Sequence, residues 1–361
     1  MSDIQKALLK RIKQQEQAMG LSSLSEEADF EEIDEEDTPA HEDAIEDSFI
    51  IKKFTEFKTN FFDVIESYDH ESLISQTYFK RPSSKESQIF VLIHGAGSSS
   101  MTFAKLATEL HKLDKSVGIF IYDLRGHGYS SPSNDFSIDS LVDDLHSVLT
   151  EFVNKHNLQS NSLYIVGHSL GGAVMAKFLS QERKDLNVRG EVILDIVEET
   201  AVKSLIAMPH FIEKRPKVFQ SISKAIEWHM NYLLFSRESA NLSIPDLLNP
   251  DLTWKTDLAL TQPAWEGWFV GLSKNFLSFK GPKLLILSAH ETLDKNLIIG
   301  QMQGKYQLVV FQNNTGHFIH EDLPTHVAHS LLDFVKRNEN PDKFMKDELG
   351  IVPKWGGKIN K

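Results

Sequence analysis

The chain has 361 residues, of which 41% are apolar and 10% aromatic, enough to bury a large core in one α/β domain. It has no cysteine, which excludes disulfides and thiolate metal sites and fits a reducing compartment. It also has no run of about 18 apolar residues, the length that a membrane-spanning helix needs, so we expect no membrane attachment.

The net charge of -13 is carried by one segment, residues 26–47, which holds thirteen Asp or Glu and no Lys or Arg. This segment has too little apolar surface to offset the entropy of ordering it. We therefore expect residues 1–48 to be an N-terminal extension with an acidic, disordered part. Its charge argues against binding to nucleic acid.

The folded part is expected to begin near Phe49 and to alternate strands with helices. Residues 61–68 and 73–79 predict two early strands, and the apolar run 88–93 is typical of a buried parallel strand. The later strands are expected at 118–122, 163–166, 191–197, 283–288 and 306–311, with helices at 101–113, 138–156, 172–179 and 324–336. This order predicts an α/β fold, a mostly parallel central sheet with helices on both faces and a site at the carboxyl ends of the strands.

Residues 200–279 break the alternation. This region contains four of the five tryptophans and is expected to be mainly helical. We interpret it as a lid insertion over the strand ends, within a domain that spans 49–340. Residues 341–361 form a polar, basic tail.

The motif Gly-x-Ser-x-Gly at 167–171 directly follows the apolar run 163–166 and precedes a predicted helix. Strand, sharp turn and helix form the context of a nucleophile elbow, in which the serine is exposed on a strained turn. Gly167 and Gly171 leave room for the neighbouring backbone. The sequence thus predicts a serine hydrolase with Ser169 as the nucleophile.

A serine hydroxyl needs a base to take its proton and an acid to orient that base. His317 follows the final strand and a glycine, so its loop can bring the imidazole to Ser169. His320, three residues further on, is the competing candidate. In this type of fold the acid precedes the histidine in the chain.

Three carboxylates are candidates for that acid. Asp195 ends the strand after the elbow helix, whereas Glu291 and Asp294 follow the strand 283–288. A carboxylate at a strand end can also be a helix cap, and this explains at least one of the three. Spacing alone leaves the choice open.

The turn 94–97, His-Gly-Ala-Gly, is expected to supply one oxyanion-hole amide, that of Ala96, and Leu170 the other. Such donors contribute about 3 kcal/mol each in well-studied hydrolases. Three polar side chains on a neighbouring loop are interpreted as scaffold hydrogen-bonding residues: Asp123, Arg125 and His127.

Seven stretches resemble the protein phosphatase methylesterase family, within the α/β-hydrolase superfamily. They are 167–173, 194–201, 215–219, 225–228, 265–273, 293–305 and 316–322. The resemblance spans about residues 75–336, and the stretches of the lid region are more specific than the elbow.

The resemblance implies an enzyme that removes the methyl ester from the C-terminal leucine of the catalytic subunit of protein phosphatase 2A. It assigns Ser169 as nucleophile, His317 as base and Asp195, in the Asp-Ile-Val-Glu motif, as acid. It implies a partner, the phosphatase catalytic subunit, bound through its methylated tail and its surface. It implies no metal and no organic cofactor, and an intracellular protein of the cytoplasm, the nucleus or both.

Two other functions are compatible with the residues. One is a general carboxylesterase for small esters. The other is a phosphatase-binding inhibitory or holding factor, against which the intact Ser169, Asp195 and His317 argue.

Overall fold

Eight strands form one sheet in the computed structural model, which describes residues 40–70, 73–84, 87–181, 185–289, 291–312 and 315–339. The strand order is β1-β2-β4-β3-β5-β6-β7-β8, antiparallel between β1, β2 and β4 and parallel elsewhere. The bounds are β1 Val64–His70, β2 Leu73–Lys80, β3 Ile89–Ile93, β4 Gly118–Tyr122, β5 Leu163–His168, β6 Val188–Leu194, β7 Lys283–Ser288 and β8 Gln307–Phe311. The predicted fold class is confirmed.

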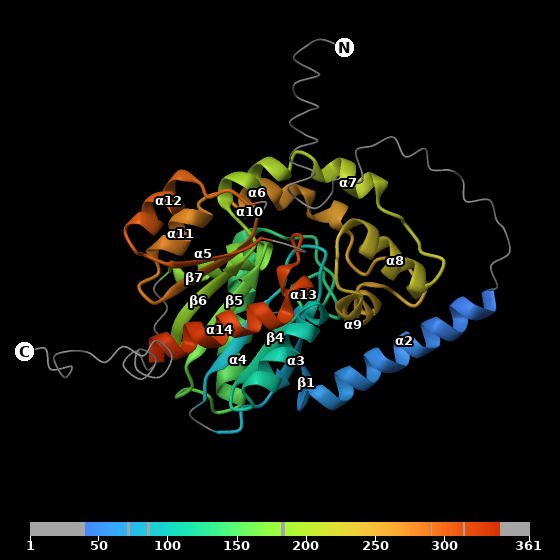
Figure 1. Cartoon of the computed structure of the whole chain (residues 1–361), viewed down its shortest axis with the longest axis horizontal. Helices are drawn as coiled ribbons and strands as arrows, with labels where there is room; N and C mark the ends of the chain where they lie inside the picture. Colours follow the sequence, from blue (N-terminus) through green and yellow to red (C-terminus); the bar gives the residue numbers. More distant parts are fainter. Residues whose placement is uncertain are drawn as a thin grey trace, which may run out of the picture.

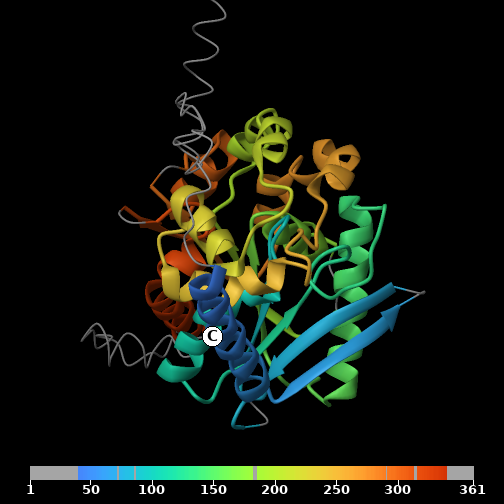
Figure 2. The ribbon, with the colours of Figure 1, turned by 90° about the vertical axis from the view of Figure 1, so that its right-hand side faces the viewer.

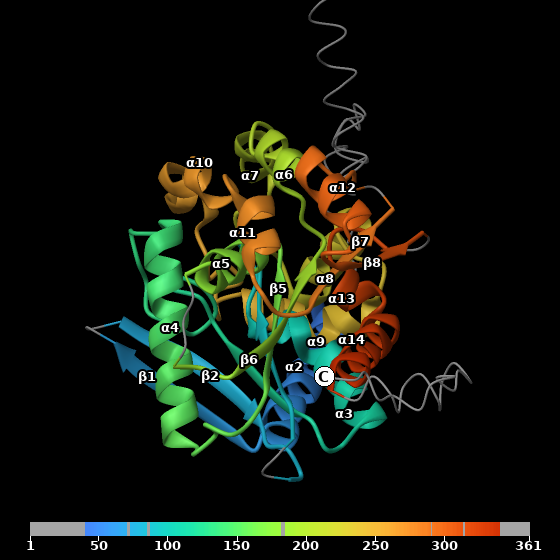
Figure 3. The same ribbon diagram turned by 90° about the vertical axis from the view of Figure 1, so that its left-hand side faces the viewer.

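Helices cover both faces of the sheet because its central strands are apolar on both sides. In β3, Val91 packs into the core on the side of α4 and α5, whereas Leu92 packs into the core on the side of α3 and α14. Figure 3 shows α4 on one side of the sheet and α3 and α14 on the other. The bounds are α3 Ala104–Leu113, preceded by the 3-10 helix η2 Ser100–Phe103, α4 Ile138–Lys155, α5 Leu170–Leu179, α13 Ile319–Asp322 and α14 Pro324–Glu339.

The lid lies between β6 and β7 and is helical, as expected, with α6, α7 and α10 above the strand ends in Figure 1. Its bounds are α6 Glu198–Ser204, α7 Met208–Lys214, α8 Ile222–Tyr232, α9 Arg237–Leu247, η3 Leu258–Ala264, α10 Trp265–Trp268 and α11 Leu272–Ser278; α12 Lys295–Met302 follows β7. Of the helices in the described ranges, none has the length and apolar character needed to cross a membrane.

Helix α2, Ala40–Phe61, differs from the expectation that the folded part begins near Phe49 and that the acidic segment is disordered to its end. The last acidic residues are instead helical and bind the lid. The Asp47 carboxylate accepts hydrogen bonds from the amides of Ile222 and Ser223, both at 2.8 Å, at the start of α8. These contacts explain the order, because a carboxylate satisfies the free amides at a helix N-terminus.

The blue helix α2 runs beside α8 and α9, as Figures 1 and 2 show. Because α2 continues to Phe61, the first strand begins at Val64 and not at the expected residue 61. Residues 1–39 of the expected leader, and the tail from 340 on, lie outside the described residues.

Candidate active site

Ser169 lies on a strained turn between β5 and α5, with φ 51° and ψ -119°. A non-glycine residue rarely adopts this conformation. The flanking glycines allow the turn, since a Cβ on Gly167 would lie 2.4 Å from the carbonyl oxygen of Gly171. A Cβ on Gly171 would lie 2.3 Å from the carbonyl oxygen of Ile93. The local sequence therefore places a half-buried serine on a sharp turn at the end of β5.

Asp195 and His317 are joined by a hydrogen bond across the sheet edge, with Nδ1 of the histidine 3.0 Å from Oδ2 of the aspartate. Asp195 follows β6 directly and has a φ of 50°, so it too lies on a sharp turn. Its other oxygen, Oδ1, accepts the backbone amide of Ser288 at 2.5 Å. The carboxylate is thus held on both oxygens, with its side chain 2% exposed.

The other two carboxylates from the sequence bond elsewhere. Asp294 accepts the amide of Leu297 at 3.0 Å and so caps the N-terminus of α12. Glu291 accepts the hydroxyl of Thr200 and lies in the same pocket as His317. The carboxyl that bonds the His317 ring is therefore that of Asp195.

His320, the competing histidine, is fully buried, and neither of its ring nitrogens has a partner within the described parts of the chain. Its ring packs on Phe103, with the centroids 4.5 Å apart. Burial lowers the pKa of His320 to about 3. The side chain thus packs as a neutral ring behind the site.

The charges around His317 favour its protonated form. Burial alone would lower the pKa of His317, but the hydrogen bond and negative charge of Asp195, with a smaller contribution from Glu291, raise it above the ordinary value. Burial and the charge of Asp195 raise the pKa of Glu291 to about 7. The imidazole is therefore bonded to one firmly held carboxylate and is also influenced by the charge of a second carboxyl, that of Glu291.

A pocket over the strand ends brings together Ser169, Asp195, His317 and Ala96. The Ser169 hydroxyl has no hydrogen-bond partner among the described residues, so it faces the pocket free. Most of the other lining side chains are apolar and come from the lid, including Leu205, Met208, Phe211, Leu258, Trp268 and Phe269. Such a wall suits an apolar group of a substrate.

The turn 94–97, which carries the Ala96 amide, is held by hydrogen bonds to two neighbouring histidines. His127 Nε2 accepts the amide of Gly97 at 3.0 Å, and His94 Nε2 accepts the amide of Leu124 at 3.0 Å. Burial lowers the pKa of His127 to about 4 and that of His94 well below its ordinary value, so both rings are neutral acceptors. In the described ranges, no acceptor is recorded for the amides of Ala96 and Leu170.

The neighbouring loop supplies the hydrogen bonds expected of a scaffold. Asp123 accepts the amides of Ser100 at 2.7 Å and Tyr129 at 2.9 Å. Arg125 binds both carboxylate oxygens of Asp144, at 2.6 and 2.7 Å. These bonds fix the loop that carries His127.

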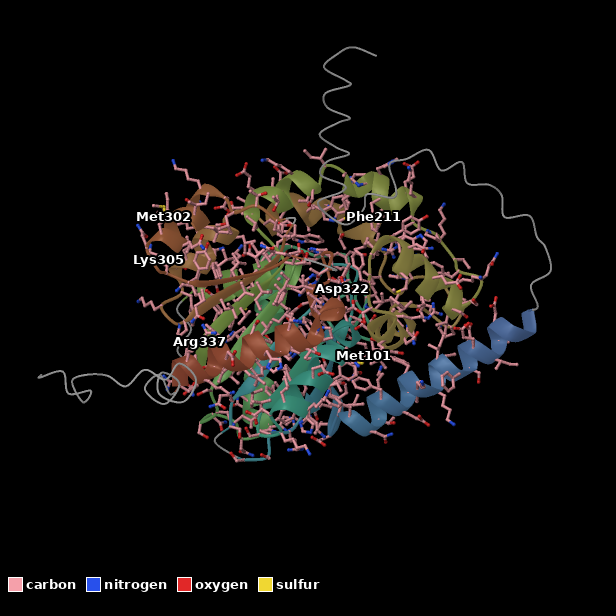
Figure 4. All side chains as sticks on the ribbon, viewed as in Figure 1. Met101, Phe211, Met302, Lys305, Asp322 and Arg337 are labelled. Carbon is pink, nitrogen blue, oxygen red and sulfur yellow. The ribbon has the colours of Figure 1, made fainter. Side chains whose placement is uncertain are left out.

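Two side chains that the sequence analysis did not single out position the His317 loop. His168 contacts the His317 backbone carbonyl, with 2.9 Å between Nε2 and the oxygen. Asp322, labelled near the centre of Figure 4, accepts the amides of Gly316 at 3.0 Å and Phe235 at 2.7 Å. The sequence could have pointed to His168, because it lies inside the elbow motif. No sequence feature pointed to the contacts of Asp322.

Comparison with known proteins decides the family. The model of the alpha/beta hydrolase family matches residues 90–328. Proteins named protein phosphatase methylesterase 1 are similar to this chain: one from Candida albicans is 55% identical over 100% of both chains, and one from Saccharomyces cerevisiae is 40% identical over 78% of each. The chain belongs to the protein phosphatase methylesterase family. It is a carboxylic ester hydrolase.

Solved structures show the same fold at low sequence identity. E-2-(acetamidomethylene)succinate hydrolase aligns with a TM-score of 0.62 at 18% identity, covering 75% of this chain and 98% of its own. An esterase of Mycobacterium tuberculosis aligns with a TM-score of 0.59 at 16% identity, covering 79% and 98%. The methylesterase lid between β6 and β7 is thus built on a core shared with many hydrolases.

Proposed function

We propose that this methylesterase removes the methyl ester from the C-terminal leucine of the catalytic subunit of protein phosphatase 2A, through an acyl-enzyme on Ser169. The observation that carries the proposal is the Asp195–His317 hydrogen bond of 3.0 Å in a pocket that Ser169 also lines. The names of the relatives and the resemblance in 293–305 support the phosphatase as substrate. The apolar lid wall suits a leucine side chain.

Acylation begins when the Ser169 oxygen attacks the ester carbonyl carbon and Nε2 of His317 takes the hydroxyl proton. Asp195 holds Nδ1–H and stabilises the imidazolium that forms. The tetrahedral oxyanion accepts hydrogen bonds from the amides of Ala96 and Leu170. The C–O bond to the methoxy group then breaks, and His317 protonates the leaving oxygen to give methanol.

Deacylation repeats these steps with water. His317 takes a proton from water, and the hydroxide adds to the acyl carbon. The C–O bond to Ser169 breaks and the serine recovers its proton. The products are the free leucine carboxylate, methanol and one proton, and no cofactor enters the balance.

The partner in this reaction is the phosphatase catalytic subunit itself, which presents its methylated tail to the pocket and its surface to the lid. The direct test is the release of methyl groups from the carboxymethylated subunit by the wild type, Ser169→Ala and Asp195→Asn. We expect losses on the order of 10⁶-fold for Ser169→Ala and 10⁴-fold for Asp195→Asn, as in other serine hydrolases.

Hydrolysis of p-nitrophenyl acetate serves as the reference activity. A wild type that cleaves this ester but releases no methyl group would be a general carboxylesterase. A Ser169→Ala variant that inhibits the phosphatase as fully as the wild type would favour a holding factor. Near-normal activity of Asp195→Asn would move the acid to Glu291 or Asp294.

A further inference from the structure

Arg215 is the one Arg or Lys among the described residues that line the active-site pocket. It follows α7 directly, in the lid wall, and its backbone is extended at φ -66° and ψ 133°. Figure 4 labels Phe211 on the same helix, and Phe211 lines the pocket as well. The lid therefore places one positive charge in an otherwise mostly apolar wall.

The Arg215 guanidinium has no carboxylate partner. Within the described part of the chain, no ion pair or side-chain hydrogen bond is recorded for it, in contrast to Arg125, which is paired with Asp144. Asp257 is the one carboxylate with a recorded electrostatic effect on Arg215, and it accepts the amide of Ala259 at 2.9 Å at the start of η3. Burial lowers the pKa of Arg215 to about 9, so at neutral pH the group is a desolvated cation.

A fixed aromatic platform holds the guanidinium. Its central carbon lies 3.5 Å from the ring centroid of Trp254, the distance of a stacked cation. The indole N–H of Trp254 donates to the carbonyl oxygen of Pro216 at 2.6 Å, and Phe219 packs on the same indole with centroids 5.2 Å apart. Stacking occupies the face of the guanidinium and leaves its N–H groups, which lie in its plane, free to donate.

The neighbouring titratable group in this wall does not supply a second cation. His229 lines the pocket beside Arg215, and its Nδ1 donates to the Ala225 carbonyl oxygen at 2.7 Å. Burial lowers the pKa of His229 to about 4, so it is neutral at pH 7. A preorganised, unpaired guanidinium is the group that binds a carboxylate through two parallel hydrogen bonds.

We propose that Arg215 is an anion subsite that binds the carboxylate side chain of an acidic residue preceding the esterified C-terminal residue of the substrate. This inference rests on the proposed function for the position of the ester at Ser169. The lid wall then binds an acidic side chain upstream of the ester through Arg215, while the apolar part of the pocket binds the side chain of the terminal residue. Arg215 is a specificity-determining residue and takes no part in bond breaking.

The test uses the full chain and short peptide methyl esters that carry Asp or Asn at successive positions before the C-terminal leucine. We expect kcat/KM of the wild type to favour Asp over Asn by about tenfold at one position, mainly through KM, which corresponds to about 1.4 kcal/mol. Arg215→Met keeps the apolar stem but should reduce this ratio to near one. Arg215→Lys, which keeps the charge without the fork, should retain part of it.

Lys217→Met is the matched control, because Lys217 is an exposed cation two residues away that does not line the pocket. Its Asp-to-Asn ratio should equal that of the wild type. A structural role for Arg215 would lower both rates together and leave the ratio unchanged. An unchanged ratio in Arg215→Met, or a wild-type ratio near one at every position, would overturn the proposal.

Failure of the proposed esterase activity can be distinguished from failure of the Arg215 subsite. If the wild type hydrolyses no peptide ester, binding of fluorescein-labelled peptide amides is measured by anisotropy. Tighter binding of one Asp peptide by the wild type but not by Arg215→Met would support the subsite, and equal binding of Asp and Asn peptides would refute it.

Discussion

The residue before Ser169 is bonded to the loop that carries His317: Nε2 of His168 lies 2.9 Å from the backbone carbonyl oxygen of His317. A carbonyl oxygen only accepts, so Nε2 carries the hydrogen. Burial, followed by the neighbouring His320 and His317, lowers the pKa of His168 well below its ordinary value and keeps the ring neutral. The elbow and the histidine loop are thus tied through one tautomer of His168.

Replacing this ring tests the connection. His168→Phe keeps an aromatic ring but removes the donor, leaving the His317 carbonyl without this bond. We expect kcat for p-nitrophenyl acetate to fall about fivefold with little change in KM, since the lost hydrogen bond, worth about 1 kcal/mol, acts on the position of the proposed base. Steady-state kinetics measure both constants.

His320→Phe is the control for that variant. The His320 ring packs on His168 with centroids 4.4 Å apart and has no hydrogen-bond partner in the described ranges. Its kcat should stay within about twofold of the wild type. A larger loss in His320→Phe than in His168→Phe would contradict the assignment of the base to His317.

Glu291 should shape the pH profile. In the proposed mechanism His317 acts as the base and must be neutral, so kcat/KM should rise with pH through the raised pKa of His317. Glu291→Gln removes a negative charge that favours the imidazolium. The rising part of the pH profile of kcat/KM, its acid limb, should therefore move to lower pH by about half a unit. The exposed Glu213→Gln on α7 should leave the limb in place. A limb that shifts upward in Glu291→Gln would refute the electrostatic argument.

Gly171→Ala should destabilise the fold. The added Cβ would lie 2.3 Å from the Ile93 carbonyl oxygen, which is backbone and cannot move aside cheaply. We expect the free energy of unfolding in urea to drop by at least about 3 kcal/mol. Gly267→Ala is the control, because its Cβ would meet nothing within 4 Å and alanine favours the helix. Equal stabilities of the two variants would contradict the predicted clash.

Helix α2 should stabilise the lid through a buried ion pair. Lys58 Nζ lies 3.1 Å from Oδ1 of Asp246 on α9, and the two side chains are 15% and 0% exposed. Lys58→Met removes the ion-pair partner of a buried carboxylate, which then keeps only the longer-range charge of Lys255, and should cost about 3 kcal/mol of unfolding free energy in urea. The double variant with Asp246→Asn should recover part of that loss.

An exposed pair on the same helix gives the comparison. Lys52 and Glu56 lie 4.0 Å apart with side chains 72% and 57% exposed, so Lys52→Met should cost less than about 0.5 kcal/mol. Similar losses for Lys52→Met and Lys58→Met would show that α2 does not act through the buried pair.

The sequence by itself determined the features that depend on short stretches of chain. Apolar runs and turn residues predicted the strands, the lid and the fold class because burial and backbone conformation are local requirements. The small residues around Ser169 predicted its strained turn for the same reason. The family resemblance rested on such stretches too, above all 293–305.

Only the tertiary structure decided which distant groups meet. The sequence offered three carboxylates as the possible acid and did not distinguish them. Asp195 bonds His317, which is 122 residues away in the chain, because β6 and β8 both end at the same edge of the sheet. Acidic composition predicted a disordered leader, yet Asp47 caps α8 and orders α2, since tertiary contacts outweigh composition. The unpaired state of Arg215 likewise depends on where every carboxylate of the lid finally lies.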